Sequence, residues 1–434
     1  MTESHELRIR VPVLARVEGE GALDVTIRDG RIEALQLRIY EPPRLFEKFL
    51  EGRSCHEVPD MVARICGICP VAYQMSAVQA LEALYGVDPG AHIRAWRRLF
   101  YCGEWLQSHS LHIHLLAAPD FLGFDSVTEM ARSYPDEVRR GLRLQALGND
   151  IIALLGGRSV HPVGACIGGF HRLPDNSEIK KIKEKLKSVY DDCVALLKWT
   201  AGLPLPDDRQ AFCCVALQQA DEYPMNAGRI RSNAGLDIAV EAYEQHFGEF
   251  QVPHSTAQYA SLHGQPYLVG PLARLNLNRD SLPSAVRQAL EATGIAFPSD
   301  NMFHSIVARA AEILFAVTEA MHILDAAPDK APARVAVRPR AGTGFGCTEA
   351  PRGLLWHRYE SDDQGHIRRA RIVPPTSQNQ ARIEQDLKAS LETFGLQRDA
   401  AALRLRAETV IRNYDPCISC ATHFLHVNLQ RREP

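Results

Sequence analysis

Two Cys-x-x-Cys pairs near opposite ends of this 434-residue chain constrain its structure more than any other feature. The first pair is Cys66 and Cys69, and the second is Cys417 and Cys420. Two thiols three positions apart can converge on one metal ion where the chain turns, and Pro70 suits the first turn of a helix that follows such a turn. The pairs therefore predict metal ligands where a loop enters a helix.

A structural zinc site is the alternative interpretation, because Cys-x-x-Cys pairs often bind zinc. In small zinc modules the two pairs are typically about 15 to 20 residues apart. Here almost the whole chain separates them. A large chain does not need such a metal for folding, which favours a reactive centre, and soft thiolates favour nickel, iron, copper(I) or zinc.

Charge and cysteine usage exclude several classes of protein. Lys plus Arg (49) nearly balances Asp plus Glu (52), so the formal charge of -3 gives no signature of nucleic-acid binding. No apolar stretch is long enough to cross a bilayer, and the first residues lack a signal sequence, which predicts no membrane insertion. Eleven scattered cysteines suit a reducing compartment, so we expect a cytoplasmic protein.

Hydrophobic periodicity predicts a mainly α fold with small peripheral β-sheets (α+β), without repeats or long linkers. Apolar residues recur at helical spacing over 91–116, 137–155, 179–197 and 303–324. Alternation around Asp29-Gly30 predicts a hairpin over 23–35. Two more strands are expected at 353–358 and 366–373, on either side of a polar turn.

The residues around the cysteine pairs resemble the two signature motifs of nickel-iron hydrogenase large subunits. These are Arg-Ile-Cys-Gly-Ile-Cys at 64–69 and Asp-Pro-Cys-Ile-Ser-Cys-x-x-His at 415–423. Further matches follow in the expected order at 16–19, 43–47, 157–162 and 349–353. The resemblance spans nearly the full length. It implies the family's fold with a central bundle of long helices, and one catalytic domain over 1–423.

The resemblance implies a role for each cysteine of the two pairs. Cys69 and Cys420 would bridge nickel and iron, and Cys66 and Cys417 would be terminal ligands of nickel. The iron of the family also carries carbon monoxide and cyanide ligands. The reaction implied is the reversible, heterolytic cleavage of H2, with Cys417 as the first proton acceptor.

Three further residues match catalytic positions of the family. Glu18 matches a glutamate that passes the proton onward, a task that suits a carboxylate with a raised pKa. Without the resemblance, a salt bridge between Glu18 and Arg16 would be the simpler interpretation. Arg352 matches an arginine over the open metal position, and Asp415 an aspartate that pairs with it. The alternatives are a surface arginine and an ordinary turn cap.

A third metal ion, magnesium or iron, is implied by Glu47 and His423, with the backbone carbonyl of Ile372 as a further ligand. Residues 424–434 resemble a C-terminal extension that a maturation endopeptidase removes in many members of the family. Cleavage between His423 and Phe424 is therefore expected.

The sequence departs from the common family pattern at three positions near these motifs. Tyr73 replaces a histidine, Glu20 replaces a histidine, and Ser108 stands where membrane-type enzymes have an aspartate. We therefore expect the metal ligands to be retained and the surrounding hydrogen bonds to differ.

Within the family, the segments 263–270 and 348–352 are similar to those of the soluble NAD(P)-linked group, which includes the alpha subunits of sulfhydrogenase-type complexes. Such enzymes have a small subunit with iron-sulfur clusters, and flavin and iron-sulfur (diaphorase-type) subunits that meet NAD or NADP. This chain has no GxGxxG after a strand and no ferredoxin-type cysteine spacing, so iron-sulfur clusters, FAD and NAD(P) are expected on partners.

The cysteines outside the two pairs are expected to be small buried hydrophobic residues. They are Cys55, Cys102, Cys166, Cys193, Cys213, Cys214 and Cys347. Two rival classes remain open beside the hydrogenase. One is a relative such as the quinone-site subunit of respiratory complex I, which lacks the cysteine pairs, and the other is a structural zinc-thiolate protein.

Overall fold

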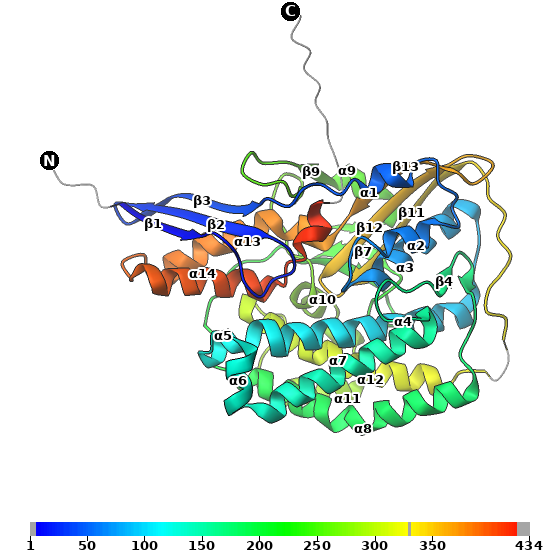
Figure 1. Ribbon diagram of the computed structural model, residues 1–434, viewed down its shortest axis with the longest axis horizontal. Helices are drawn as coiled ribbons and strands as arrows, with labels where there is room; N and C mark the ends of the chain where they lie inside the picture. The colour runs from blue at the N-terminus through cyan, green and yellow to red at the C-terminus, as the bar shows by residue number, and fades with distance from the viewer. Residues whose placement is uncertain (1–5, 329–330, 423–434) are drawn as a thin grey trace, which may run out of the picture.

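The computed structural model describes residues 6–328 and 331–422. Long helices form one layer and small β-sheets lie above it, as Figure 1 shows. The helices of this layer are α4 (Gly90–Leu111), α7 (Pro135–Gly156), α8 (Asn176–Ala201) and α12 (Ser305–Asp325). Helix α4 packs on α7 and α12, and α8 packs on α12. The predicted α+β fold is confirmed, as are the four predicted helices.

Two three-stranded antiparallel sheets carry the predicted hairpins. The first contains β1 (Glu6–Val11), β2 (Gly21–Arg28) and β3 (Arg31–Ile39) in that order. Asp29 and Gly30 both have positive φ, as a type I′ turn requires. The second contains β11 (Gly342–Ala350), β12 (Gly353–Ser361) and β13 (Ile367–Val373). The outer strands β1 and β11 were not expected from the sequence.

The remaining helices and strands pack on these layers or connect them. The helices are α1 (Phe46–Leu50), α2 (Val58–Val62), α3 (Pro70–Tyr85), α5 (Ala118–Leu122), α6 (Val127–Ser133), α9 (Tyr243–His246), α10 (Pro271–Asn278), α11 (Ser284–Glu291), α13 (Pro375–Phe394) and α14 (Ala400–Tyr414). The strands are β4 (Ala165–Cys166), β5 (Gly169–Phe170), β6 (Val215–Gln218), β7 (Arg229–Ser232), β8 (Asp237–Ile238), β9 (Phe247–Phe250) and β10 (Tyr259–Leu262).

Helix α3, which follows the first cysteine pair, lies directly on strand β11. A Cβ atom on Gly344 would lie 2.1 Å from the carbonyl oxygen of Ala80, and one on Gly346 would lie 2.2 Å from that of Ser76. Only glycine permits this close approach of strand and helix. Two side chains extend the contact, since the Ser76 and Thr348 hydroxyls are 2.6 Å apart. The sheet therefore fixes the helix that carries one half of the cysteine site.

The predicted helix over 91–116 ends in a different geometry from the expected one. After α4 the chain continues as a π-helical turn, His112–Ala117. Its His112 ring is fully buried and lies 2.8 Å from the carbonyl oxygen of Arg412 on α14. Wider π-helical turns often occur at functional sites, because they change the direction of side chains within a helix.

Among the described residues, none of the helices has both the length and the apolar character that a membrane span requires.

Candidate metal centre

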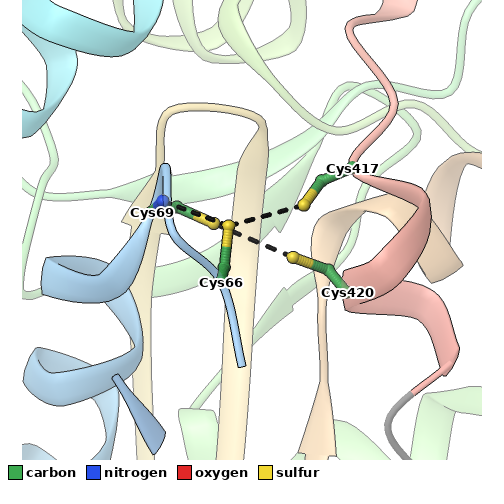
Figure 2. A group of neighbouring side chains, drawn as sticks. All are labelled: Cys66, Cys69, Cys417 and Cys420. Carbon is green, nitrogen blue, oxygen red and sulfur yellow. Dashed lines mark hydrogen bonds between the residues drawn. The ribbon is translucent and has the colours of Figure 1, made fainter. Parts of the chain in front are cut away.

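The four cysteines of the two pairs meet at one buried point. Their sulfur atoms all lie within 4.8 Å of one another, and each residue is at most 3% exposed. Figure 2 shows the four side chains pointing toward one another. The Sγ atoms of Cys66 and Cys417 are 3.5 Å apart, and those of Cys69 and Cys420 are 3.9 Å apart. We call these four residues the four-cysteine cluster. Such separations suit sulfur atoms around one metal ion, for which a metal–sulfur bond is about 2.3 Å.

The first pair sits where a loop enters helix α3, as predicted. Cys69 is the N-cap residue of α3, and Pro70 is its first residue. The backbone N–H groups of Ile68 and Cys69 both donate to the Cys66 sulfur, at 3.3 and 3.2 Å. These N–H groups and the positive end of the helix dipole stabilise negative charge on the sulfur.

A buried glutamate that the sequence did not single out holds this junction. Glu104 of α4 accepts hydrogen bonds from the N–H groups of Val71 and Ala72, at 2.6 and 3.1 Å. One turn further along α4, Gln107 donates to the Ile68 carbonyl oxygen. Burial raises the pKa of Glu104 well above its usual range, although the two N–H groups oppose the shift. Its signal in the sequence was an acidic residue inside a predicted core-facing helix.

Arg44 ties the two halves of the site together. Its Nη2 donates to the carbonyl oxygen of Ile65, beside the first pair, at 2.7 Å, and also to that of Ser419, within the second pair. On the second pair, the Cys417 N–H donates to the Thr376 hydroxyl at 3.0 Å. Arg44 lies within the matched motif at 43–47, but no role was predicted for it. The Arg44 guanidinium therefore bonds the backbone of both loops that carry the cysteines.

The pKa values of the cluster thiols are shifted in opposite directions. Burial alone would raise the pKa of the Cys66 thiol, but hydrogen bonds from Cys417, Cys420 and Cys69 hold it well below its usual range. Burial and the neighbouring sulfur atoms raise the pKa of Cys417 well above its usual range. These pKa directions favour the thiolate form at Cys66 and the thiol form at the other three cysteines. A metal ion can bind the thiolate first and then displace the protons of the three thiols.

Arg352 lies beside the cluster and is paired as predicted. Its Nη2 donates to Oδ1 of Asp415 at 2.9 Å, and its Nε donates to the Asp415 carbonyl oxygen at 2.6 Å. Burial would lower the pKa of the guanidinium, but the charges of Asp415 and of Cys417, Cys69 and Cys66 raise it well above its usual range. Both side chains are at most 4% exposed, so the surface arginine considered from sequence is excluded. Asp415 is also the left-handed C-cap residue of α14.

Glu18 lies along the second cysteine pair. Its carboxylate accepts hydrogen bonds from the Ser419 hydroxyl and, at 3.1 Å, from the Ser419 N–H. The Ile418 N–H donates to its backbone carbonyl oxygen at 3.0 Å. Arg16 instead pairs with Asp120 and donates to the Leu116 carbonyl oxygen at 2.8 Å. Arg16 is therefore engaged elsewhere, and the salt bridge considered from sequence is not the arrangement found.

The structure brings together two of the three residues expected at the additional metal site. Oε1 of Glu47, on α1, accepts a hydrogen bond from the N–H of Ile372 on β13 at 2.7 Å. His423, the third expected ligand, and residues 424–434 lie outside the described residues.

The three departures from the family pattern occupy different environments. Tyr73 and Ser108 are at most 1% exposed, and their hydroxyl groups have no hydrogen-bond partner within the described ranges. Glu20 is exposed, and its backbone N–H donates to Glu41 at 2.9 Å. Tyr73 and Ser108 are therefore the two positions at which a change in the surrounding hydrogen bonds remains a prediction.

The other cysteines are mostly buried, as predicted, and none forms a disulfide. Two differ from the prediction because Cys166 and Cys213 are only half-buried. Cys166 lies in the short strand β4 and Cys213 precedes β6, so neither side chain is enclosed within a helical layer.

The chain is similar to known hydrogenase subunits over almost its whole length. The profile of the nickel-dependent hydrogenase family matches residues 44–138 and 241–423. Sulfhydrogenase 1 subunit alpha of Pyrococcus furiosus is 32% identical over 97% of this chain and 99% of its own length. The NAD-reducing hydrogenase HoxS subunit beta of Cupriavidus necator is 29% identical, over 96% of this chain and 95% of its own.

A solved structure agrees at the level of the fold. A chain in the crystal structure of an NAD+-reducing [NiFe]-hydrogenase in the H2-reduced state superposes with a TM-score of 0.86. It is 29% identical and covers 96% of this chain and 99% of its own length.

Proposed function

Because this chain belongs to the nickel-dependent hydrogenase family and is the catalytic subunit of a hydrogenase, we propose that it cleaves H2 at a nickel-iron centre and passes electrons through iron-sulfur partners to NAD(P). The observation that carries this proposal is the four-cysteine cluster, assembled from both ends of the chain and buried. Cys69 and Cys420 are proposed to bridge nickel and iron, and Cys66 and Cys417 to bind nickel alone.

The residues around the cluster fit a centre that carries small polar ligands. Nη1 of Arg352, the Tyr73 hydroxyl and the Ser377 hydroxyl are buried without a hydrogen-bond partner within the described ranges. Ser377 follows Thr376, which accepts from the Cys417 backbone, and the charges of the cluster cysteines act on both Tyr73 and Arg352. Unpaired buried donors are costly, so these atoms would donate to acceptors on the bound centre, such as the nitrogen of a cyanide ligand. When bound, the centre supplies redox metal ions that take the electrons of H2.

The chain itself supplies the proton route. We assign Cys417 as the first proton acceptor and Glu18 as the next, because Glu18 and Cys417 are joined by a parallel bridge of the backbone. Two contacts from Ser419 fix the orientation of the Glu18 carboxylate. Glu18 is half-buried, so the proton moves from the enclosed cluster toward solvent.

Arg352 and Asp415 form the polar side of the site. The guanidinium stays protonated, because nearby negative charges hold its pKa well above its usual range. Asp415 accepts two hydrogen bonds from the guanidinium of Arg352. The third guanidinium nitrogen, Nη1, has no hydrogen-bond partner among the described residues. A fixed cation can orient and polarise H2 as it is split.

Glu47, Ile372 and His423 are proposed to bind the third metal ion, magnesium or iron. The contact between Glu47 and the backbone of Ile372 supports this assignment, since it places a carboxylate beside strand β13. Metal analysis of the purified chain should then give one magnesium or one extra iron per chain, and E47Q should lose it.

We propose that electrons leave this subunit through the part of its surface that contains Gly67. Gly67 lies between the two cysteines of the first pair and is exposed. Next to it, His161 contacts the Ala63 carbonyl oxygen at 2.7 Å, and Val160 and Val163 expose 53% and 39% of their surface. This exposed apolar surface beside the cluster suits a small subunit with iron-sulfur clusters, because electron transfer requires a short path.

The names of two relatives support a proposal for the wider assembly. One relative is named an NAD-reducing hydrogenase and another is an alpha subunit, which supports flavin and iron-sulfur diaphorase-type partners that hold FAD and NAD(P). We place the complex in the cytoplasm, since all eleven cysteines are free and NAD(P) is a cytoplasmic substrate. A maturation endopeptidase is proposed to cut between His423 and Phe424, and intact mass of the nickel-loaded chain tests this.

An infrared spectrum of the purified complex, taken with its nickel and iron content, tests the central proposal. We expect bands in the carbon monoxide and cyanide stretching region with stoichiometric nickel. Zinc in the cluster of fully matured protein, without such bands, would leave a structural metal protein instead.

A further inference from the structure

A fully buried group of charges lies between the helical layer and the turn that carries Arg352. Arg274 of α10 donates to Glu312 of α12 through Nε at 2.8 Å and Nη2 at 2.7 Å. Its Nη1 donates to Glu349 of β11 at 3.0 Å. All three side chains are 0% exposed. We call them the Arg274 network.

The same guanidinium also holds the backbone that leads to Arg352. Its Nη1 donates to the carbonyl oxygen of Ala350 at 2.7 Å, and its Nη2 donates to that of Pro351 at 3.0 Å. The five N–H donors of Arg274 thus meet five acceptors, two on each terminal nitrogen and one on Nε. No other side chain could make this set of bonds from one position, because only arginine has such a planar fork.

Two further contacts close around the same turn. The Trp105 Nε1 of α4 donates to the backbone carbonyl of Glu349 at 3.1 Å, so three successive carbonyls before Arg352 are bonded to buried side chains. A Cβ on Gly270 would lie 2.9 Å from the Arg352 carbonyl oxygen, and one on Gly353 would lie 2.7 Å from the Gly270 nitrogen. The Pro351–Arg352 turn therefore packs directly against the start of α10.

Stability alone does not account for such a network. Removing charges from water costs several kcal/mol per ion, and replacing a buried ion pair by apolar side chains is often neutral or stabilising. A buried group of charges that also bonds successive carbonyls instead restricts where the backbone can lie. The element restricted here ends at the guanidinium that faces the four-cysteine cluster.

We propose that Arg274 is a positioning residue, which holds the Pro351–Arg352 turn so that the Arg352 guanidinium keeps its place beside the four-cysteine cluster. This inference rests on the proposed function, since the role of Arg352 in the hydrogen reaction is part of it. Displacement of a reacting or polarising group by about 1 Å can lower a rate by about 100-fold.

The test compares R274K with a matched control, R97K. Arg97 is also a buried arginine in a two-bond pair, with Glu82 at 2.7 and 2.6 Å. Its other hydrogen bond within the described residues goes to the Cys166 carbonyl oxygen, far from the Arg352 turn. Lysine keeps the charge but cannot reach both carboxylates and both carbonyls. We expect both variants to lose thermal stability, but only R274K to lower kcat per nickel, by about 10- to 100-fold, and to shift the infrared bands of the centre.

A second variant separates positioning from stability. R274M leaves Glu312 and Glu349 buried without their cation, and R274M/E312L removes one of these two carboxylates. We therefore expect the Tm of R274M/E312L to recover in part relative to R274M while kcat per nickel stays low. Wild-type kcat per nickel in R274M/E312L, or equal losses in R274K and R97K, would overturn the proposal.

A crystal structure of R274K adds a readout that does not depend on activity. We expect the Arg352 guanidinium to be displaced from its wild-type position, and an unmoved guanidinium would contradict positioning by Arg274. If the wild-type complex has neither nickel nor H2 activity, the proposed function fails, whereas the position of Arg352 in R274K still decides this inference.

Discussion

Arg352 and Asp415 are joined through both side chain and backbone, because Nη2 donates to the carboxylate at 2.9 Å and Nε donates to the carbonyl oxygen at 2.6 Å. Asp415 directly precedes Pro416 and the second cysteine pair, so the arginine is fixed to the segment that supplies half of the metal ligands. The position of the cation and that of the sulfur atoms therefore cannot vary independently.

Substituting Arg352 with lysine should lower H2 oxidation while the metal content stays unchanged. Lysine keeps the charge but loses the planar fork that bonds Asp415 twice and still presents Nη1. We expect kcat per nickel to fall by about 100-fold, as for removal of one preorganised donor. Activity with an artificial electron acceptor, normalised to nickel, measures this, and a wild-type value would exclude a catalytic role for the guanidinium.

Glu18 should be required for proton transfer but not for assembly of the centre. E18Q retains the size, can still accept from the Ser419 N–H and can donate to the Ser419 hydroxyl, but it cannot accept a proton. We expect H2 turnover and H/D exchange into solvent to fall by about 100-fold or more, with infrared bands still present. The control is E41Q, since the Glu41 carboxylate lies nearby but accepts a hydrogen bond from the Glu20 N–H rather than from the second cysteine pair. Equal exchange rates in E18Q and E41Q would remove Glu18 from the proton route.

Loss of one cluster thiol should prevent metal loading. C69S replaces a soft thiolate by a hydroxyl that stays protonated, so nickel and iron should be absent and activity lost. C213S is the control, because Cys213 is free, half-buried and outside the cluster. Nickel-loaded, active C69S would show that the metal does not depend on this sulfur.

The buried histidines of α4 and its π-helical turn should make the chain sensitive to acid. Burial lowers the pKa of His109 to about 4, of His112 to about 3 and of His114 to about 4, from 6.5. Because the folded-state values lie below the unfolded one, their contribution to stability is complete above pH 6.5 and is lost as pH falls toward 4. Each can add a slope of about 1.4 kcal/mol per pH unit to the unfolding free energy.

The measurement is the unfolding free energy of the chain between pH 7 and about pH 4.5, by denaturant titration. His114 lies 2.9 Å from the Ser110 carbonyl oxygen and stacks on Trp199. H114Q should reduce proton uptake on unfolding by about one proton in this range. An unchanged slope in H114Q would mean that His114 is not buried in its neutral form.

A charge at the proposed electron exit should weaken binding of the iron-sulfur partner. Val160 and Leu405 are both 53% exposed, but only Val160 lies beside the cluster loop. We expect V160E to raise the dissociation constant of the complex by about tenfold or more, because a charge would be buried at the interface, whereas L405E should leave it unchanged. Equal affinities for the two variants would place the partner elsewhere.

The sequence predicted the helices and the cluster well, because both have local signals. Long amphipathic segments such as 179–197 show their period, and each cysteine pair has its own motif. The contacts of Glu104, Arg44 and Arg274 were not predictable, since each joins segments far apart in the chain. Strand β11 was missed for a related reason, because its Gly344 and Gly346 are explained only by the helix packed against them.

The hydrogen bonds of Arg44 to Ile65 and Ser419 have a consequence for the timing of synthesis. The first cysteine pair leaves the ribosome long before the second, whereas a domain generally folds as a unit. Until Ser419 is made, Arg44 lacks one of its acceptors and the cluster has only two of its sulfur atoms. A nascent or truncated chain thus cannot form the complete cluster, and a fully liganded metal centre marks a chain whose translation has passed Cys420.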